Sequence, residues 1–171
     1  MKLIKLNRMY QKDRELILAI AGFILIIGAY FLFKIDTKIF LGLIGTVATL
    51  YLGAIKYRIE NDRLFKELFS DFNTRYDGRM SDLLNSLRRK KSYELNEEEK
   101  NLVISYLNLC SEEFLWRNRN RVPSEVWSAC LSGIKENLKI PQVREMYEDE
   151  ISSDNGKNSF YGLVEEIGDI K

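Results

Sequence analysis

Two long apolar stretches, separated by five residues, limit what this chain can fold into more than any other feature. Residues 16–33 contain no Asp, Glu, Lys or Arg, and residues 39–57 contain only Lys56. As a helix, the first stretch is about 27 Å long, close to the roughly 30 Å hydrocarbon core of a bilayer. The charged end of Lys56 can reach the membrane surface along its own alkyl chain. The sequence therefore predicts a two-helix transmembrane hairpin over residues 16–57.

A cleaved signal peptide or a buried helix of a soluble protein can also contain an apolar stretch. The apolar part of a signal peptide is usually about 7–15 residues long. The first stretch is longer, no A-x-A-like cleavage site follows it, and a second apolar stretch comes next. A soluble core could bury one such helix, but two of them flanked by lysines are typical of a membrane protein. The hairpin is therefore the preferred interpretation.

Basic residues gather on the same side of both predicted spans. Five lie in the segment of residues 1–15 and five in residues 56–75, whereas the connecting loop holds only Lys34 and Lys38. Because basic flanking segments stay in the cytoplasm, both termini are predicted to be cytoplasmic. The only two cysteines lie in helical apolar patterns without CxxC spacing, which agrees with reduced thiols in that compartment.

The charge of the chain divides at the end of the second stretch. Residues 1–58 carry nine basic and three acidic side chains, a net charge of +6, and residues 59–171 carry 17 basic and 22 acidic ones, a net charge of −5. A basic membrane end suits an anionic lipid surface. An acidic soluble part is unlike a domain that coats nucleic acid, which is usually basic overall.

The residue types needed for many kinds of catalysis are missing. The chain has no His, no glycine-rich phosphate loop and no nucleophile elbow, which removes His-based acid–base chemistry and imidazole metal sites. We therefore expect no catalytic residue, no cofactor, no metal and no small-molecule substrate, and we expect that the protein is not an enzyme.

One acidic pair, Glu112 and Glu113, lies beside the aromatic residue Trp116. Neighbouring residues of a helix point about 100° apart, so these two carboxylates cannot converge on one substrate atom. We expect a structural role for the pair, in which one carboxylate binds a nearby arginine of the segment 117–121.

Small residues on the two apolar stretches indicate how the spans pack. In the second stretch they recur every four residues on one face, a small-xxx-small pattern that lets helix backbones approach closely in lipid. The residues predicted to pack are Gly42, Gly45, Thr49, Gly53, Ala21 and Gly28. Two alternatives remain open, since these faces could close the hairpin within one chain or assemble several copies into a homo-oligomer.

The segment of residues 58–151 is predicted to be an all-α cytoplasmic domain, because its apolar residues recur at helical spacing and no strand pattern of useful length is present. The second span continues as a helix to about Tyr76, and Gly78 interrupts it. Asn96, with Glu99 three residues later, predicts the start of a further helix with a capping box. Together with the hairpin, the fold class is an all-α protein whose membrane hairpin continues into a small helical bundle of five helices.

Two prolines mark the starts of the last predicted helices. Pro123 and Pro141 suit the first turn of a helix, where a missing backbone N–H costs nothing. The tail of residues 152–171 is predicted to be polar and mobile up to Ser159. Its apolar residues from Phe160 onward have two alternatives, docking onto the domain or binding another molecule.

Clusters of basic and aromatic residues are the candidate partner surface. A run of four cations ends one predicted helix, and alternating arginines follow Trp116. The candidate residues are Arg117, Arg119, Arg121, Trp116, Trp127, Arg88, Arg89, Lys90 and Lys91. Contact with lipid phosphates or nucleic acid is one interpretation, and a solvated helix terminus is the alternative.

Three motif segments resemble a set of bacterial proteins. The segments are FN-x-RY at residues 72–76, YLNLC-x-EE at residues 106–113 and VPSEVW at residues 122–127, and the resemblance covers residues 64–162. Proteins of this set carry one or two N-terminal transmembrane helices and a small helical domain. Some two-helix proteins of this sort are similar to membrane effectors of antiphage systems, including those that accompany retrons. Proteins of this set usually have a second tryptophan shortly after the VW pair, and this chain has Ala129 and Cys130 there instead.

Two functions remain open, of which the resemblance implies the first. The first is an effector of the bacterial inner membrane that permeabilises the bilayer when a regulatory partner, such as a reverse transcriptase with its nucleic acid, releases it. The second is a membrane-anchored adaptor that recruits a cytoplasmic protein through an aromatic face around Trp116, Trp127 and Tyr147. The resemblance supplies no catalytic residue for either function.

Overall fold

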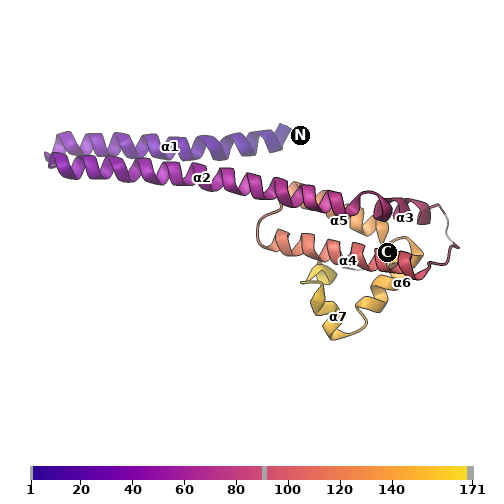
Figure 1. Ribbon diagram of the computed structural model, residues 1–171. Helices are drawn as coiled ribbons and strands as arrows, with labels where there is room; N and C mark the ends of the chain where they lie inside the picture. Colours follow the sequence, from indigo (N-terminus) through magenta and orange to yellow (C-terminus); the bar gives the residue numbers. More distant parts are fainter. Residues whose placement is uncertain (1, 90–91, 169–171) are drawn as a thin grey trace. The chain divides into compact units, whose positions relative to one another are not determined.

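The computed structural model describes residues 2–89 and 92–168 of the chain. Every regular element in these residues is a helix (Figure 1). The helices are α1 (Lys2–Phe33), α2 (Thr37–Tyr76), α3 (Arg79–Leu87), α4 (Glu97–Asn118), α5 (Ser124–Asn137), α6 (Pro141–Glu150), α7 (Asp154–Ser159) and α8 (Leu163–Ile167). Their contacts divide the chain into two compact units, of which the first ends at Asp62 and the second begins at Arg63. The all-helical prediction is confirmed.

The turn between α1 and α2 is shorter than the predicted loop. Lys34 follows the last residue of α1 with a φ of 48°, the left-handed conformation that often ends a helix. The Asp36 carboxylate then accepts a hydrogen bond of 2.8 Å from the Lys38 backbone N–H. Because Asp36 caps the helix in this way, α2 begins at Thr37, before the apolar stretch itself.

In the first unit, α1 and the N-terminal part of α2 lie side by side and antiparallel (Figure 1). Near the turn, the ring centroids of Tyr30 and Phe40 are 4.5 Å apart. Farther from the turn, a Cβ atom on Gly22 would lie 3.5 Å from the Val47 side chain. At the end of the apolar stretches away from the turn, Arg58 of α2 forms an ion pair of 2.9 Å with the Glu15 carboxylate of α1.

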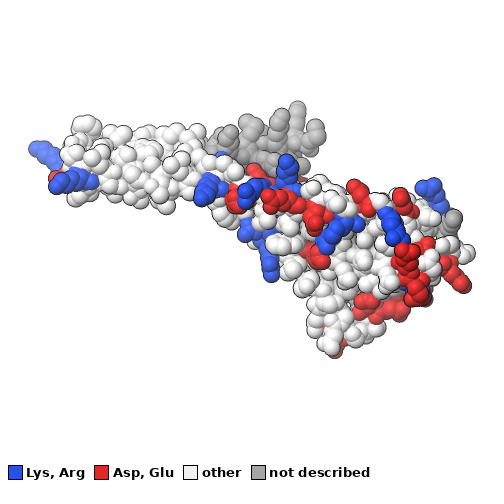
Figure 2. Space-filling view, in the orientation of Figure 1, with Lys and Arg blue, Asp and Glu red and all other residues white. Residues whose placement is uncertain are grey.

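The two helices of the first unit are long and apolar enough to cross a membrane. Their outward side chains are exposed, with Ile17, Leu25 and Phe31 at 61, 73 and 75 %. Figure 2 shows almost no charged residue along these apolar lengths on the face it presents, and Lys and Arg where they end. The coarse prediction of two membrane-spanning helices is therefore supported by length, composition and exposure.

In the second unit α4 packs against α3, α5 and α6. Its N-terminus has the predicted capping box, since the Asn96 side chain accepts from the Glu99 N–H at 3.0 Å and the Glu99 carboxylate accepts from the Asn96 N–H at 2.9 Å. Gly78 interrupts the chain between α2 and α3 as predicted, with a φ of 74°. Pro141 is the first residue of α6, whereas Pro123 caps α5 from one position earlier than predicted.

The C-terminal segment differs from its predicted mobile form over the residues that the structure describes. It forms the short helices α7 and α8, and Phe160, Leu163 and Ile167 are buried in the core. The Phe160 ring packs edge-on against the Tyr147 ring of α6, with the two ring centroids 5.8 Å apart. Of the two alternatives, the structure shows the C-terminal segment docked onto the domain. The helices α7 and α8 are additional to the five that were predicted.

Removing the Phe160 ring tests this docking. Phe160→Ala should lower the free energy of unfolding of the detergent-solubilised protein by about 3–5 kcal/mol, because the ring is 2 % exposed and leaves a cavity. The neighbouring Tyr161 is 50 % exposed, so Tyr161→Ala should cost less than about 1 kcal/mol. Urea unfolding followed by circular dichroism measures both. Equal effects of the two changes would mean that the segment is not part of the core.

Candidate functional site

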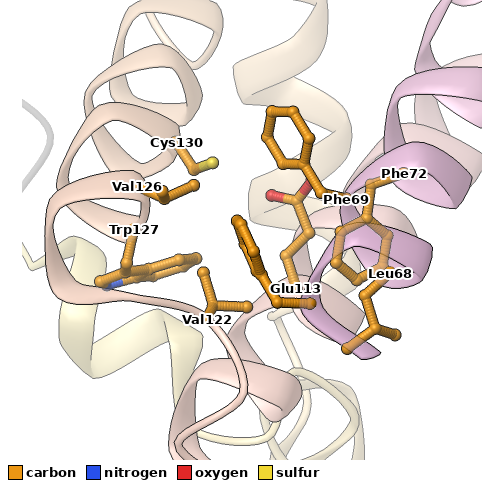
Figure 3. A pocket seen from close by; sticks show the side chains of 9 residues that line it. Leu68, Phe69, Phe72, Glu113, Val122, Val126, Trp127 and Cys130 are labelled. Atoms are coloured by element: carbon orange, nitrogen blue, oxygen red, sulfur yellow. The ribbon is translucent and has the colours of Figure 1, made fainter. Parts of the chain in front are cut away.

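Two adjoining hollows lie between α2, α4 and α5 within the second unit, and both are lined by Phe72, Glu113 and Cys130. The first hollow is apolar apart from Glu113, as the close view in Figure 3 shows. The second is open to solvent, has a volume of about 190 Å³ and includes uncharged polar groups. The first is lined by Phe65, Leu68, Phe69, Phe72, Glu113, Val122, Val126, Trp127 and Cys130. The second is lined by Phe72, Asn73, Tyr76, Tyr106, Leu109, Cys110, Glu113, Cys130, Gly133, Ile134 and Asn137.

Helical spacing explains how these side chains meet. Tyr106, Cys110 and Glu113 follow one another by four and three positions on α4, so they share one face. Phe72 and Tyr76 are related in the same way on α2. Glu113 thus lies in line with buried residues of α4, and this spacing is the signal by which the sequence could have distinguished it from Glu112.

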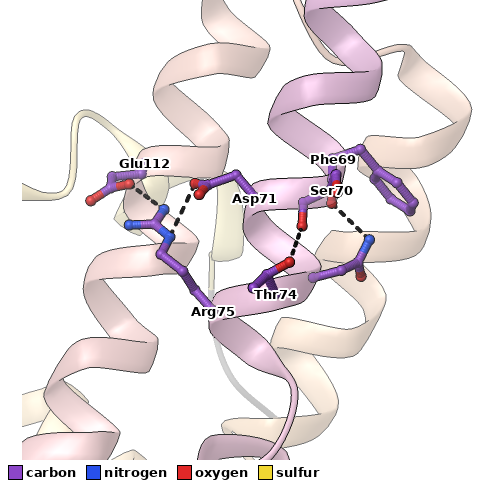
Figure 4. Close-up of polar contacts among 7 residues, drawn as sticks. Phe69, Ser70, Asp71, Thr74, Arg75 and Glu112 are labelled. Carbon is purple, nitrogen blue, oxygen red and sulfur yellow. Dashed lines mark hydrogen bonds and ion pairs between the residues drawn. The ribbon is translucent and has the colours of Figure 1, made fainter.

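The acidic pair is separated by its environment. Glu112 binds the Arg75 guanidinium at 2.5 Å, and Arg75 also pairs with Asp71 of its own helix at 3.2 Å (Figure 4). The expectation that a carboxylate of the pair binds an arginine of the segment 117–121 is therefore wrong, because α2 supplies the arginine instead. Adjacent helix positions point apart, so Glu113 cannot share this partner.

Glu113 receives no hydrogen bond from any residue that the structure describes, and its carboxyl group lies among Phe69, Val126 and Cys130 (Figure 3). Burial disfavours the ionised form and raises the pKa of Glu113 to about 7, although the charge of Arg75 opposes this shift. The carboxyl group is therefore divided between its neutral and ionised forms near neutral pH.

The two thiols of the hollows are protonated at neutral pH. Burial raises the pKa of Cys110 well above its usual value and that of Cys130 to about 11. Because the thiolate is the reactive form, neither is poised as a nucleophile. Among the described residues, no group of three or more His, Cys, Asp or Glu side chains could hold a metal ion.

A buried amide, that of Asn137, is among the groups that line the second hollow. The Asn137 side chain donates a 2.8 Å hydrogen bond to the Tyr106 hydroxyl and accepts one of 2.5 Å from Arg88. Burial raises the pKa of Tyr106, so its hydroxyl stays neutral. Arg88, predicted as a partner contact, is thus tied to the core through Asn137.

The remaining candidate partner residues lie in different surroundings. Arg117 donates to the Val122 carbonyl at 3.3 Å and to the Ser124 hydroxyl at 3.2 Å, so it holds the loop before α5. Arg119 stacks over the Trp116 ring at 5.4 Å. Arg89 is exposed, Arg121 is half-buried, and Lys90 and Lys91 lie outside the described residues.

The predicted aromatic surface is wrong. Trp127 and Tyr147 are 5 and 3 % exposed, and the Trp127 indole N–H donates to Glu166 of α8 at 3.2 Å. These rings pack in the core because the C-terminal segment covers them, so they cannot form an exposed face with Trp116. If the protein is an adaptor, it must therefore recruit its partner through a different surface.

The small residues of α2 do not pack against α1. A Cβ atom on Gly42, Gly45 or Gly53 would meet nothing within 4 Å, and the same holds for Gly28 of α1. Helical geometry puts Gly45 about 160° around α2 from Val47, which faces α1. Thr49 lies between Gly45 and Gly53 along this face, and its hydroxyl donates to the Gly45 carbonyl at 2.8 Å. On α1, the predicted packing residue Ala21 is exposed. The hairpin is closed by Gly22 and Val47 instead.

The three motif segments identified in the sequence meet at the hollows. Phe72 comes from the first segment, Tyr106 and Glu113 come from the second, and Trp127 comes from the third. In comparisons with protein-family models, with curated proteins and with solved structures, nothing matched this chain. The function must therefore be inferred from the geometry and chemistry of the chain itself.

The raised pKa of Glu113 predicts a pH dependence of stability. Between its ordinary pKa of 4.5 and about 7, the folded protein binds more protons at this carboxyl group than the unfolded chain. Stability contributed by the neutral group is therefore full below pH 4.5 and is lost as pH rises towards 7. Glu113→Gln should remove this loss, so the melting temperature of the variant should exceed that of the natural protein at about pH 8 more than at about pH 5.

Glu125→Gln serves as the matched control, since it changes an exposed carboxyl group of α5 that lies outside both hollows and does not bind Arg75. It should not flatten the pH profile. If Glu113→Gln and the natural protein lose the same number of degrees between about pH 5 and about pH 8, the carboxyl group is not protonated in the folded state at neutral pH.

Proposed function

We propose that the protein is a membrane effector of bacterial antiphage defence. In this proposal α1 and α2 form a hairpin in the inner membrane, both termini are cytoplasmic, and the second unit is a cytoplasmic helical bundle. A regulatory partner, such as a reverse transcriptase with its nucleic acid, holds the effector inactive. Release from the partner lets several copies assemble and permeabilise the membrane.

The role in antiphage defence rests on the resemblance of the three motif segments, and the unoccupied small-residue face of α2 is the observation that carries the assembly step. Gly45 and Gly53 are exposed on the side of α2 away from α1, with open space where a Cβ atom would be. Close approach of a second helix needs such positions, because a larger side chain would keep the two backbones apart. A face that the chain does not use within its own hairpin is available to another copy.

The composition of the spans supports permeabilisation by an assembly. Proton relays and ion carriers normally place an acidic or basic residue within the membrane. The stretch from Leu16 to Phe33 has none, and neither has Ile39 to Ile55. A single hairpin therefore has no group with which to carry an ion, so conduction requires several hairpins or a disturbed bilayer.

Expression of the protein without its partner should depolarise bacteria. A voltage-sensitive dye should report loss of membrane potential after induction of the natural sequence. Gly45→Leu combined with Gly53→Leu should abolish the loss, because leucine side chains fill the face that a second copy needs. Leu43→Ile combined with Leu50→Ile is the control, since both positions are exposed on α2 away from this face and the change to isoleucine conserves side-chain volume. Depolarisation by both double variants would exclude assembly through the small-residue face.

Exchange of the hairpin separates this proposal from the adaptor alternative. Residues 16–57 are replaced by a two-span hairpin of unrelated sequence, and phage protection is measured in cells that carry the partner. An effector should lose protection, because the spans themselves act on the membrane. Retained protection at equal membrane abundance would show that the hairpin only anchors the protein.

A further inference from the structure

The second hollow has the size and lining of a site for a compact small molecule. Its volume of about 190 Å³ is below the range usual for drug-sized ligands but exceeds the roughly 150 Å³ of an apolar cavity that holds benzene. Phe72 and Tyr76 of α2 face Leu109 of α4 and Ile134 of α5, so most of the wall is apolar. Glu113 is the one charged side chain among the described residues that line it.

The uncharged polar groups of the hollow do not neutralise this carboxylate. The Asn73 side chain donates to the Phe69 carbonyl at 2.7 Å, and the Asn137 side chain donates to the Tyr106 hydroxyl. One N–H of each amide is thus used elsewhere, and neither amide donates to Glu113. Glu113 is half-buried and most of the wall around it is apolar, so water solvates its carboxylate less well than that of a fully exposed residue.

The nearest cation is already occupied. Arg75 binds Glu112 and Asp71, and it influences Glu113 only through its charge. Ionised Glu113 therefore receives no direct hydrogen bond from residues 2–89 and 92–168, and a ligand that enters the hollow can supply one.

We propose that this hollow binds a small molecule with one ammonium group on a compact apolar body, and that the ammonium group pairs with the Glu113 carboxylate. A hydrogen bond between an ammonium group and a carboxylate is roughly twice as strong as one between neutral groups. An anion would be repelled, an uncharged molecule would leave the carboxylate unpaired, and a second positive charge would have no counter-charge in the wall.

This binding site does not depend on the proposed membrane activity. The expectation of no small-molecule substrate was based on missing catalytic motifs, and a binding site needs none of them. Ligand binding and membrane potential are measured separately, so failure of one proposal leaves the other standing.

Calorimetric titration of the full-length protein in nanodiscs tests the proposal. The probes are benzylamine and n-butylamine, with benzyl alcohol and n-butanol as uncharged molecules of the same shape. At about pH 8 each amine should bind about tenfold or more tightly than its alcohol, as expected for a hydrogen bond between charged groups. Equal affinity of amine and alcohol, or no saturable binding of either amine at millimolar concentration, overturns the proposal.

Variants assign the binding to Glu113 and to the hollow. Glu113→Gln keeps the shape of the side chain and should weaken amine binding about tenfold or more. Glu125→Gln, which changes an exposed carboxyl group of α5 outside the hollows, should leave amine binding unchanged. Gly133→Leu should also abolish binding, since a Cβ atom on Gly133 meets nothing within 4 Å and the larger side chain can fill the hollow without a clash. Gly133→Ala is its control. Unchanged binding by Glu113→Gln, or by Gly133→Leu, overturns the assignment.

The pH dependence gives an independent measurement on the unaltered protein. The other ionisable side chains around this hollow are Arg75 and Tyr76 on α2, Tyr106 and Cys110 on α4, and Cys130 on α5. The pKa values of Arg75, Tyr106, Cys110 and Cys130 are all raised, so these four groups keep their charge state between about pH 5 and about pH 8. Amine affinity should therefore fall about tenfold or more from pH 8 to pH 5, as Glu113 becomes neutral. A flat profile overturns the proposal.

Discussion

The apolar surface of the first two helices needs an environment that the chain itself does not supply. Sixteen large hydrophobic side chains from Leu16 to Tyr57 are exposed in the structure. Each such side chain contributes roughly 1.5–3 kcal/mol when it leaves water, so together they represent tens of kcal/mol. The whole stability of a typical domain is only about 5–15 kcal/mol. Exposure of this surface to water is therefore the one state that the protein must avoid, and a bilayer provides the simplest alternative.

The lipid environment also changes which contacts hold helices together. Lipid tails are as apolar as leucine, so apolar side chains gain little by leaving lipid for another helix. Close packing and hydrogen bonds then decide association. Within the chain, Gly22 permits close packing with Val47, and Glu15 pairs with Arg58 at the end of the apolar lengths. The same reasoning makes Gly45 and Gly53 important only if another helix approaches them.

Local signals in the sequence predicted the helices of the second unit well, because each helix start depends on a few adjacent residues. Asn96 with Glu99, Gly78 and Pro141 act through backbone hydrogen bonds and φ angles that neighbouring residues determine. The docking of Phe160 could not be chosen in this way. Its polar surroundings from residue 152 to 159 favoured a mobile tail, and its burial depends on Tyr147, which is distant in sequence.

The candidate site could be predicted only in part, because it too depends on contacts between residues that are distant in the sequence. Helical geometry separated Glu112 from Glu113, but it could not say that the partner of Glu112 would be Arg75 of α2. Trp127 was predicted to be part of an exposed surface, and the C-terminal segment covers it instead. Contacts between elements distant in the chain decide which polar residues lose water, and periodicity within one element carries no information about them.

The position of Glu113 is difficult to explain by stability alone. A glutamine or a leucine would fit the same helix face, and neither would have to be neutralised in apolar surroundings. Structural acids usually have a partner, as Glu112 has Arg75 and Glu15 has Arg58. Conflicts between local stability and residue choice are expected at functional sites. A carboxyl group with a pKa of about 7, at the junction of two hollows, is such a conflict, and a cation that enters the hollow would resolve it.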